Sequence, residues 1–230
     1  KVEQEVHRLF PEARTLRMDR DTTSKKNSHE QILESFGRGD ADILIGTQMI
    51  VKGHDFSRVT LVGVLLADLT LFSGDYRAGE RTFDLLTQAA GRAGRGDVPG
   101  KVVIQTYKPD NYVITAAASQ DYRAFYDIEE AYRSLMRYPP EWNMMVIMGT
   151  GMDEEQLANI MDRMYSLLRG KYINAGHLSV IGPSEPAISK IKDVYRRVLY
   201  IKHRDYRMLV DVKDYVEEWL KENGENDVSV

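Results

Sequence analysis

Short apolar runs alternate with helical patterns in the first half of the chain, and this alternation most restricts its fold. The runs lie at 42–46, 60–67 and 101–107, and a shorter alternating segment lies at 14–18. Runs of this kind are typical of strands buried on both faces. Between them, helical patterns occur at 1–10, 28–36 and 77–90. This order predicts an α/β fold with a parallel sheet and helices on both faces, and functional residues at the carboxyl ends of the strands.

The character of the sequence changes after Pro109. Residues 111–137 have a helical pattern, which Tyr138, Pro139 and Pro140 interrupt. The later segments are typical of a small α+β module, with strands and helices expected at 144–148, 154–169, 177–181, 195–202 and 206–221. We therefore predict two domains, an α/β domain over 1–137 and a smaller α+β domain over 138–230.

Composition excludes several classes of protein. The 230 residues are 43% hydrophobic and 29% charged, which is ordinary for a globular protein with a sizeable core. A net charge of −4 excludes a general polycation, so a nucleic-acid partner would need a local basic surface. The absence of cysteine excludes disulfides and thiolate zinc sites, and the five histidines show no metal spacing. No apolar run approaches the roughly 20 residues of a membrane span.

Two arginines set among glycines follow the helix predicted at 77–90. Segment 88–96 reads Gln-Ala-Ala-Gly-Arg-Ala-Gly-Arg-Gly. Glycine permits close backbone approach, and the guanidinium fork matches phosphate oxygens. The segment predicts a turn that directs Arg92 and Arg95 at an anion. The alternative is a solvated helix end, where both arginines interact with the helix dipole.

A second polar segment begins just past the run at 42–46. It starts Gly-Thr-Gln-Met at 46–49 and continues as Lys-Gly-His-Asp-Phe at 52–56. A hydroxyl, an amide and glycine-exposed backbone suit contacts with nucleic-acid phosphates, and the Asp55 carboxylate suits a ribose hydroxyl. The alternative is an ordinary strand-to-helix loop.

These segments carry a resemblance to a known family. Segment 46–56 resembles the fifth conserved motif of superfamily 2 helicases, and segment 88–95 resembles the sixth. Segments 18–22, 75–81 and 181–197 narrow the resemblance to the PriA family of primosomal replication-restart helicases. The resemblance covers essentially the whole chain, and it implies a RecA-like second helicase lobe followed by the family's C-terminal domain.

The resemblance also implies roles for individual residues. Arg92 and Arg95 match arginine fingers that reach the γ-phosphate of ATP, and Gln88 matches a nucleotide sensor. Further nucleotide-binding positions are Gly53, Asp55 and Gly91. Positions that contact the DNA backbone are Thr47, Gln48 and Lys52. Tyr195 and Arg196 are candidates for partner binding in the C-terminal domain, with an exposed basic strand as the alternative.

The implied activity is an ATP-dependent 3′–5′ DNA helicase that assembles a primosome at stalled forks in a bacterial cytoplasm. Its cofactor would be ATP with Mg. Its partners would be single-stranded and forked DNA, single-strand binding protein and other primosome proteins. No membrane partner is expected.

Several family features are missing from the sequence. The P-loop, the metal-binding box and the zinc cluster do not occur, and we expect them upstream of Lys1. We also expect Val230 to truncate the second domain. The chain by itself is therefore predicted to be inactive. Two alternatives remain: a non-catalytic nucleic-acid or protein-binding module with a helicase-like lobe, and a branch-migrating superfamily 2 translocase.

Overall fold

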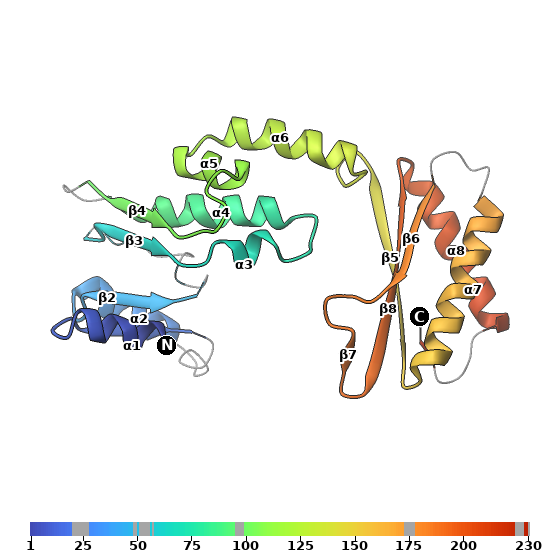
Figure 1. The fold of residues 1–230 in the computed structure, drawn as a ribbon, viewed down its shortest axis with the longest axis horizontal. Coiled ribbons are helices and arrows are strands. Elements are labelled where there is room, and N and C mark those ends of the chain that lie inside the picture. The colour runs from blue at the N-terminus through green and yellow to red at the C-terminus, as the bar shows by residue number, and fades with distance from the viewer. Residues whose placement is uncertain are drawn as a thin grey trace. The chain divides into compact units, whose positions relative to one another are not determined.

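The computed structural model describes residues 1–19, 28–47, 50, 56, 58–94, 99–172, 178–223 and 228–229 (Figure 1). The chain divides into two compact units, Lys1–Tyr126 and Asp127–Val230. The division lies within helix α6 (Tyr122–Leu135), before the Tyr138 break at which the sequence predicts a domain boundary. The first turn of α6 packs in the core of the first unit, where the ring of Phe125 stacks on that of Phe83 at 4.3 Å.

The first unit begins with one parallel strand pair. Its elements are α1 (Val2–Leu9), β1 (Thr15–Met18), α2 (Ser28–Arg38) and β2 (Ile43–Gly46). Strand β1 pairs with β2 from Thr15 opposite Ile43 to Met18 opposite Gly46. The core of this part contains Met18, Leu33 and Phe56.

A second parallel pair follows in the same unit. Its elements are β3 (Leu61–Val64), α3 (Asp68–Leu71), α4 (Ala78–Ala90), β4 (Lys101–Ile104), α5 (Tyr112–Ser119) and the first turn of α6. Leu61 of β3 lies opposite Lys101 of β4. Val64 and Ile104 pack against a core formed mainly by α4 and α5. Helix α5 begins at an Asn111 cap, whose side chain accepts a hydrogen bond from the Val113 N–H at 2.9 Å.

The predicted α/β class and the parallel strand pairing are confirmed. The strands are shorter than predicted, because 60–67 ends at Val64 and 101–107 ends at Ile104. Beyond the strand ends, the Gln105 N–H still donates to the Val64 carbonyl and the Ala67 N–H to the Gln105 carbonyl, and side-chain hydrogen bonds then follow. The Asp68 carboxylate accepts one bond from the Thr106 hydroxyl and one from the Tyr107 N–H, both at 3.0 Å.

The helical pattern at 111–137 corresponds to two separate helices, α5 and α6. Gln120 takes a left-handed conformation with φ of 55°, which ends α5. Asp121 then opens α6, since its carboxylate accepts a hydrogen bond from the Ala124 N–H at 2.9 Å. The Asp121 side chain therefore satisfies a backbone N–H that a continuous helix would have paired internally.

The second unit is an antiparallel sheet covered by two helices. Its elements after α6 are β5 (Asn143–Gly151), α7 (Glu154–Tyr172), β6 (Ser179–Ser184), β7 (Lys190–Ile191), β8 (Val194–His203), α8 (Tyr206–Asn223) and β9 (Val228–Ser229). The strand order is β6-β8-β5-β9, with β7 paired to β8. Helices α7 and α8 lie on the same side of this sheet (Figure 1), and Met161, Leu199 and Val212 are among the residues that pack between the layers.

Residues before β5 cover one end of this sheet. Lys202 on β8 is only 4% exposed, and its ammonium donates to the Met136 carbonyl at 3.1 Å. The same ammonium lies 3.5 Å from the ring centre of Tyr138. Burial lowers the pKa of Lys202, and repulsion from Arg137 lowers it further. The end of α6 and the following turn thus form part of the second unit's packing.

Candidate functional site

Helix α4 presents Gln88 to solvent on the face opposite its core. Phe83, Leu86 and Ala89 are buried at helical spacing, whereas Asp84 and Gln88 are exposed. The apolar stripe therefore sets the rotation of the helix, and with it the direction of Gln88.

The arginine turn follows α4 directly and is held by backbone hydrogen bonds. The Arg92 N–H donates to the Ala89 carbonyl at 3.1 Å, which tightens the end of the helix. Gly94 has a φ of +76°, and its N–H donates to the Val59 carbonyl at 3.0 Å. A Cβ on Gly94 would lie 2.4 Å from the Gly100 nitrogen, so only glycine fits there. Half-buried Arg92 therefore lies two residues before Gly94, whose backbone position is fixed by these contacts.

The turn lies beside the amino ends of β3 and β4, since Val59 precedes β3 and Gly100 precedes β4. The arginine turn, predicted at the end of a helix, therefore lies at the amino ends of these strands, whereas Thr47 lies at the carboxyl end of β2. The bond from Gly94 to Val59 joins the turn to the chain just after segment 46–56. The ends of the two predicted motifs are thus brought together.

Five predicted site residues lie outside the described part of the chain: Gln48, Lys52, Gly53, Asp55 and Arg95. Thr47 is described, and it is exposed directly after β2, at a carboxyl strand end as predicted. Gly91 is half-buried at the end of α4, where its N–H donates to the Thr87 carbonyl at 2.9 Å.

A charged network at the start of α4 was not among the predicted site residues. The Asp75 carboxylate accepts from the Arg77 N–H at 2.9 Å and pairs with the Arg81 guanidinium at 2.7 Å. Although Asp84 is an exposed residue, partial desolvation of its carboxyl group raises its pKa, and repulsion from Glu80 raises it further. An acidic residue six positions before an arginine at a helix start is the sequence signal that could have indicated this network.

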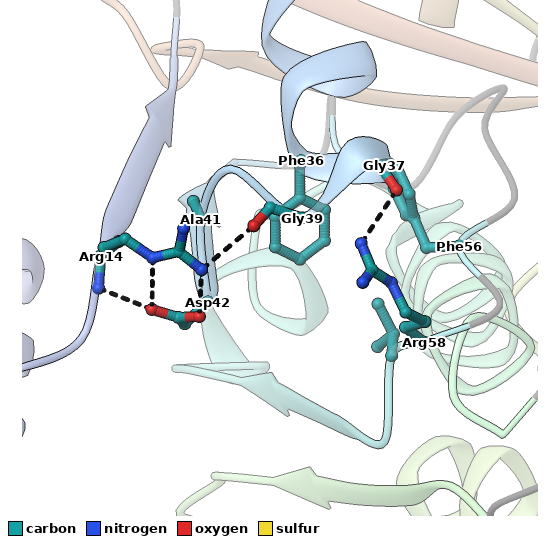
Figure 2. Close-up of a pocket in the computed structure, with 9 residues that line it drawn as sticks. Arg14, Phe36, Gly37, Gly39, Ala41, Asp42, Phe56 and Arg58 are labelled. Atoms are coloured by element: carbon teal, nitrogen blue, oxygen red, sulfur yellow. Dashed lines mark hydrogen bonds and ion pairs between the residues drawn. The ribbon is translucent and has the colours of Figure 1, made fainter.

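A pocket of about 330 Å³ lies at the amino ends of β1, β2 and β3. Figure 2 shows its lining, in which the Arg58 guanidinium lies near Phe56. Residues preceding the three strands contribute Arg14, Asp42 and Val59 to the wall. The guanidinium of Arg58 donates to the Gly37 carbonyl at 3.2 Å, near the end of α2.

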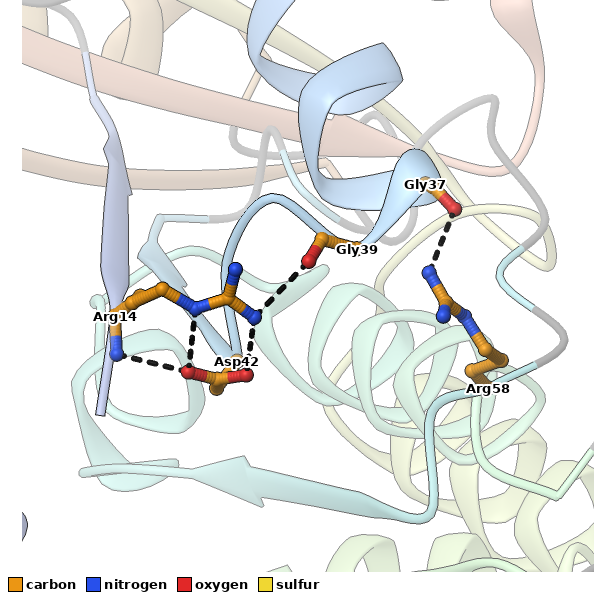
Figure 3. A network of polar contacts seen from close by, with 5 residues as sticks. All are labelled: Arg14, Gly37, Gly39, Asp42 and Arg58. Carbon is orange, nitrogen blue, oxygen red and sulfur yellow. Dashed lines mark hydrogen bonds and ion pairs between the residues drawn. The ribbon is translucent and has the colours of Figure 1, made fainter. Parts of the chain in front are cut away.

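An ion pair between Arg14 and Asp42 forms the other side of this pocket (Figure 3). The Arg14 guanidinium donates to both Asp42 carboxylate oxygens, at 2.7 and 3.0 Å, and to the Gly39 carbonyl at 3.0 Å. These hydrogen bonds lower the pKa of Asp42 from 3.8 to about 2, and the Arg14 N–H adds a further bond to the carboxylate. The ion pair thus connects the residues that immediately precede β1 and β2.

The partner-binding candidates of the second unit lie at the hairpin of β7 and β8. The Tyr195 hydroxyl accepts a hydrogen bond from the Lys190 ammonium at 3.2 Å. The Arg196 N–H donates to the Ser189 carbonyl at 2.8 Å, and the residue is half-buried. Both candidates therefore contribute to the hairpin, and their predicted role stays a prediction.

Within the described ranges, no group of three His, Asp or Glu side chains is placed to hold a metal ion. Across the same part of the chain, no helix combines the length and apolarity needed to cross a membrane.

Comparison with protein families first defines the class. Residues 2–97 match the family described as helicase conserved C-terminal domain. The match includes segment 46–56, α4 and the arginine turn, so the candidate site lies within the residues that resemble this helicase domain.

Relatives then indicate a particular family within that class. The chain is 45% identical over 210 residues to replication restart protein PriA of Bacillus subtilis, covering 91% of this chain and 26% of that protein. PriA of Synechocystis is 38% identical over 206 residues, covering 90% and 24%. PriA of Chlamydia pneumoniae is 41% identical over 202 residues, covering 88% and 27%. The chain spans about a quarter of the length of these relatives, and the predicted resemblance to PriA is confirmed over most of the chain.

Proposed function

We propose that this chain is the part of an ATP-dependent replication-restart helicase that supplies arginine fingers and DNA-backbone contacts. Its similarity to PriA and the helicase match over 2–97 support this role. The other half of the ATP site, with the P-loop, would belong to a first helicase lobe. The complete enzyme would move along single-stranded DNA in the 3′ to 5′ direction.

The observation that carries the proposal is the fixed geometry of the arginine turn. Gly94 is bonded to Val59, and Arg92 is held half-buried between α4 and that bond. A guanidinium on a pre-ordered turn meets an anion with little reorganisation, which is what stabilisation of transition-state charge requires. A freely solvated helix end would have no need for glycine at both 94 and 100.

In the proposed mechanism, closure of the two lobes brings Arg92 and Arg95 to the γ-phosphate. Their positive charge stabilises the charge that develops on the transferring phosphoryl group. Gln88, on the exposed face of α4, senses the nucleotide across the lobe interface. Gly53, Asp55 and Gly91 would complete the contacts of this lobe, with Asp55 accepting from the ribose.

The side chains at this site fit phosphate better than metal. Arg92, Arg95 and Gln88 offer N–H donors, which match phosphate oxygens but not a divalent cation. The Mg ion that accompanies ATP would therefore be held by groups outside these residues. When bound, ATP supplies the phosphoryl group whose transfer drives movement.

Contacts with DNA would come from the other end of segment 46–56. Thr47 is exposed at the carboxyl end of β2, and Gln48 and Lys52 follow it. These side chains suit backbone phosphates and carry no base specificity. In the second unit, Tyr195 and Arg196 would contact single-strand binding protein or another primosome protein. The setting would be stalled, forked DNA in a bacterial cytoplasm.

The test is DNA-stimulated ATPase activity of the full-length protein, comparing wild type with Arg92→Ala and Arg95→Ala. We expect each variant to lose several hundred-fold or more in turnover, because an arginine finger contributes roughly 10³–10⁵ in rate. Arg8→Ala is the matched control. Arg8 is an exposed arginine of the same unit, paired with Glu5 on α1, and its loss should leave turnover unchanged.

Full activity in both finger variants would contradict the assignment. The 230-residue chain alone should hydrolyse no ATP, since its lobe has fingers without a P-loop. ATP hydrolysis by that chain would equally overturn the proposal.

A further inference from the structure

Arg58 carries a positive charge that no described carboxylate balances. Among the described residues its guanidinium reaches one acceptor, the Gly37 carbonyl at 3.2 Å, and it forms no ion pair. A guanidinium has several N–H donors in a planar fork, so most of those of Arg58 are not used by the protein. The alternative is that Arg58 serves only to hold the end of α2, whose last carbonyls lack partners within the helix.

The other charges in the pocket cancel each other. Arg14 and Asp42 lie on the side opposite Arg58, and the Arg14 guanidinium donates to both Asp42 carboxylate oxygens (Figure 2). The Asp42 carboxylate is thus already paired within the lining. The lining therefore has one positive charge in excess, that of Arg58, which suits a ligand with a single negative charge.

Much of the remaining lining is apolar. Phe36 and Phe56 meet edge to face, with their ring centres 5.0 Å apart, and Ala41 and Val59 also line the pocket. The cavity volume of about 330 Å³ falls within the range of small-molecule sites, roughly 300–1,000 Å³. Such sites combine apolar walls with a few polar groups that orient the ligand. Arg58 is the group that can do so here.

The absence of a side chain at Gly39 allows Arg58 to take its position. A Cβ at position 39 would collide with the Arg58 guanidinium, which therefore packs directly on the backbone of this residue. That backbone is held in turn, because the Gly39 carbonyl accepts from the Arg14 guanidinium at 3.0 Å. A donor positioned before the ligand arrives loses less side-chain entropy when it binds an anion.

Val59 connects this pocket to the arginine turn. The Val59 carbonyl accepts from the Gly94 N–H at 3.0 Å, and the Val59 N–H donates to the Phe56 carbonyl at 3.3 Å. Both Phe56 and Val59 line the pocket. A ligand that contacts Val59 is therefore one hydrogen bond away from the residue that fixes the turn.

We propose that this pocket binds a small aromatic carboxylate, and that the bound ligand shifts the arginine turn through Val59. The ligand carboxylate accepts from the N–H groups of Arg58, and its ring packs against Phe36 and Phe56. The site needs neither ATP nor DNA. The proposal therefore stands or falls independently of the proposed helicase activity.

The test is calorimetric titration of the 230-residue chain and of the full-length protein with phenylacetate. We expect saturable binding to one site per chain in both proteins. Acetate lacks the ring and 2-phenylethanol lacks the charge, so each should bind about tenfold or more weakly than phenylacetate.

A pair of arginine variants identifies the site. Arg58→Gln should weaken the binding of phenylacetate about tenfold or more, because it removes the charged donor of the carboxylate. Arg38→Gln is the matched control. Arg38 is an exposed arginine at the end of the same helix, but it pairs with Asp40 at 3.0 Å and does not line the pocket. Its loss should leave the affinity unchanged.

Amide chemical shifts test the link to the arginine turn. Saturation of the 230-residue chain with phenylacetate should shift the signals of the Arg58 side chain and of the Gly94 amide. If the Gly94 signal stays in place while that of Arg58 moves, the link through Val59 is wrong.

Three other results would overturn the site itself. Phenylacetate would fail to saturate either protein, or would bind the 230-residue chain but not the full-length protein. Arg58→Gln would bind it as tightly as wild type does, which would leave Arg58 with its role at the end of α2. Acetate or 2-phenylethanol would bind as tightly as phenylacetate, so that either the ring or the charge contributes nothing.

Discussion

At the scale of single residues, Gly94 links the conformation of the arginine turn to its surroundings. Its φ of +76° costs an alanine about 1–2 kcal/mol, and a Cβ would also meet the Gly100 nitrogen at 2.4 Å. Gly74 has nearly the same conformation, with φ of +74°, but a Cβ there meets nothing within 4 Å. Alanine at position 74 would therefore suffer backbone strain alone, whereas alanine at position 94 would suffer both backbone strain and a steric clash.

We predict that Gly94→Ala lowers the free energy of unfolding more than Gly74→Ala does. Urea unfolding of the 230-residue chain should show a loss of about 1–2 kcal/mol for Gly74→Ala. The loss for Gly94→Ala should be larger, because Pro99 and Gly100 must move as well. Equal losses would mean that the turn is not held against the entry to β4.

Asp42 makes stability depend on acid pH. Its pKa is about 2 in the folded chain, below the ordinary 3.8, because Arg14 donates hydrogen bonds to the ionised form. A lowered carboxyl pKa stabilises the folded state above the ordinary value, and this contribution is lost as the pH falls towards 2. We predict that the stability difference between wild type and Asp42→Asn is constant above about pH 5 and shrinks between about pH 4 and 2. Unfolding measured across that range checks this, and a constant difference would contradict it.

At the scale of secondary-structure elements, local sequence patterns predict whether a segment is a helix or a strand, but not where that helix or strand ends. The apolar runs at 42–46, 60–67 and 101–107 do contain parallel strands. The prediction that they are buried on both faces is wrong for β3 and β4, where Leu61 and Val103 are 61% and 48% exposed. The predicted carboxyl ends of β3 and β4 are wrong where a side chain distant in sequence forms hydrogen bonds with the backbone that follows the strand. Asp68 ends β4 from a position nearly forty residues away in sequence, and periodicity carries no information about such a contact.

The candidate site shows the same limit. Exposed Gln88 follows from the apolar stripe of α4, which periodicity reveals. The position of the arginine turn beside Val59 and Gly100 depends on a hydrogen bond and a glycine contact between separate segments. Residue types alone therefore predict an anion-directed turn, but they do not reveal that this turn lies beside the amino ends of β3 and β4.

At the scale of the whole molecule, the boundary between the two compact units lies within α6, whose two ends pack in different units. Its first turn belongs to the first unit through Phe125 and Phe83. Its later turns contain Glu129 and Arg133, an almost fully buried ion pair at 2.7 Å. The Met136 carbonyl just beyond α6 accepts from the buried Lys202 ammonium. A domain that begins at Tyr138, as the sequence predicts, would lack this carbonyl and the buried ion pair.

We therefore predict that a protein of residues 127–230 is more stable than one of residues 138–230. The shorter protein lacks the Met136 carbonyl that accepts from the Lys202 ammonium, and a hydrogen bond to a charged group contributes about 1.5–3 kcal/mol. Lys202→Met removes the charge that needs that acceptor, so it should narrow the difference in melting temperature between the two proteins. If both proteins melt at the same temperature, the end of α6 contributes nothing to the second unit, and the boundary belongs at Tyr138.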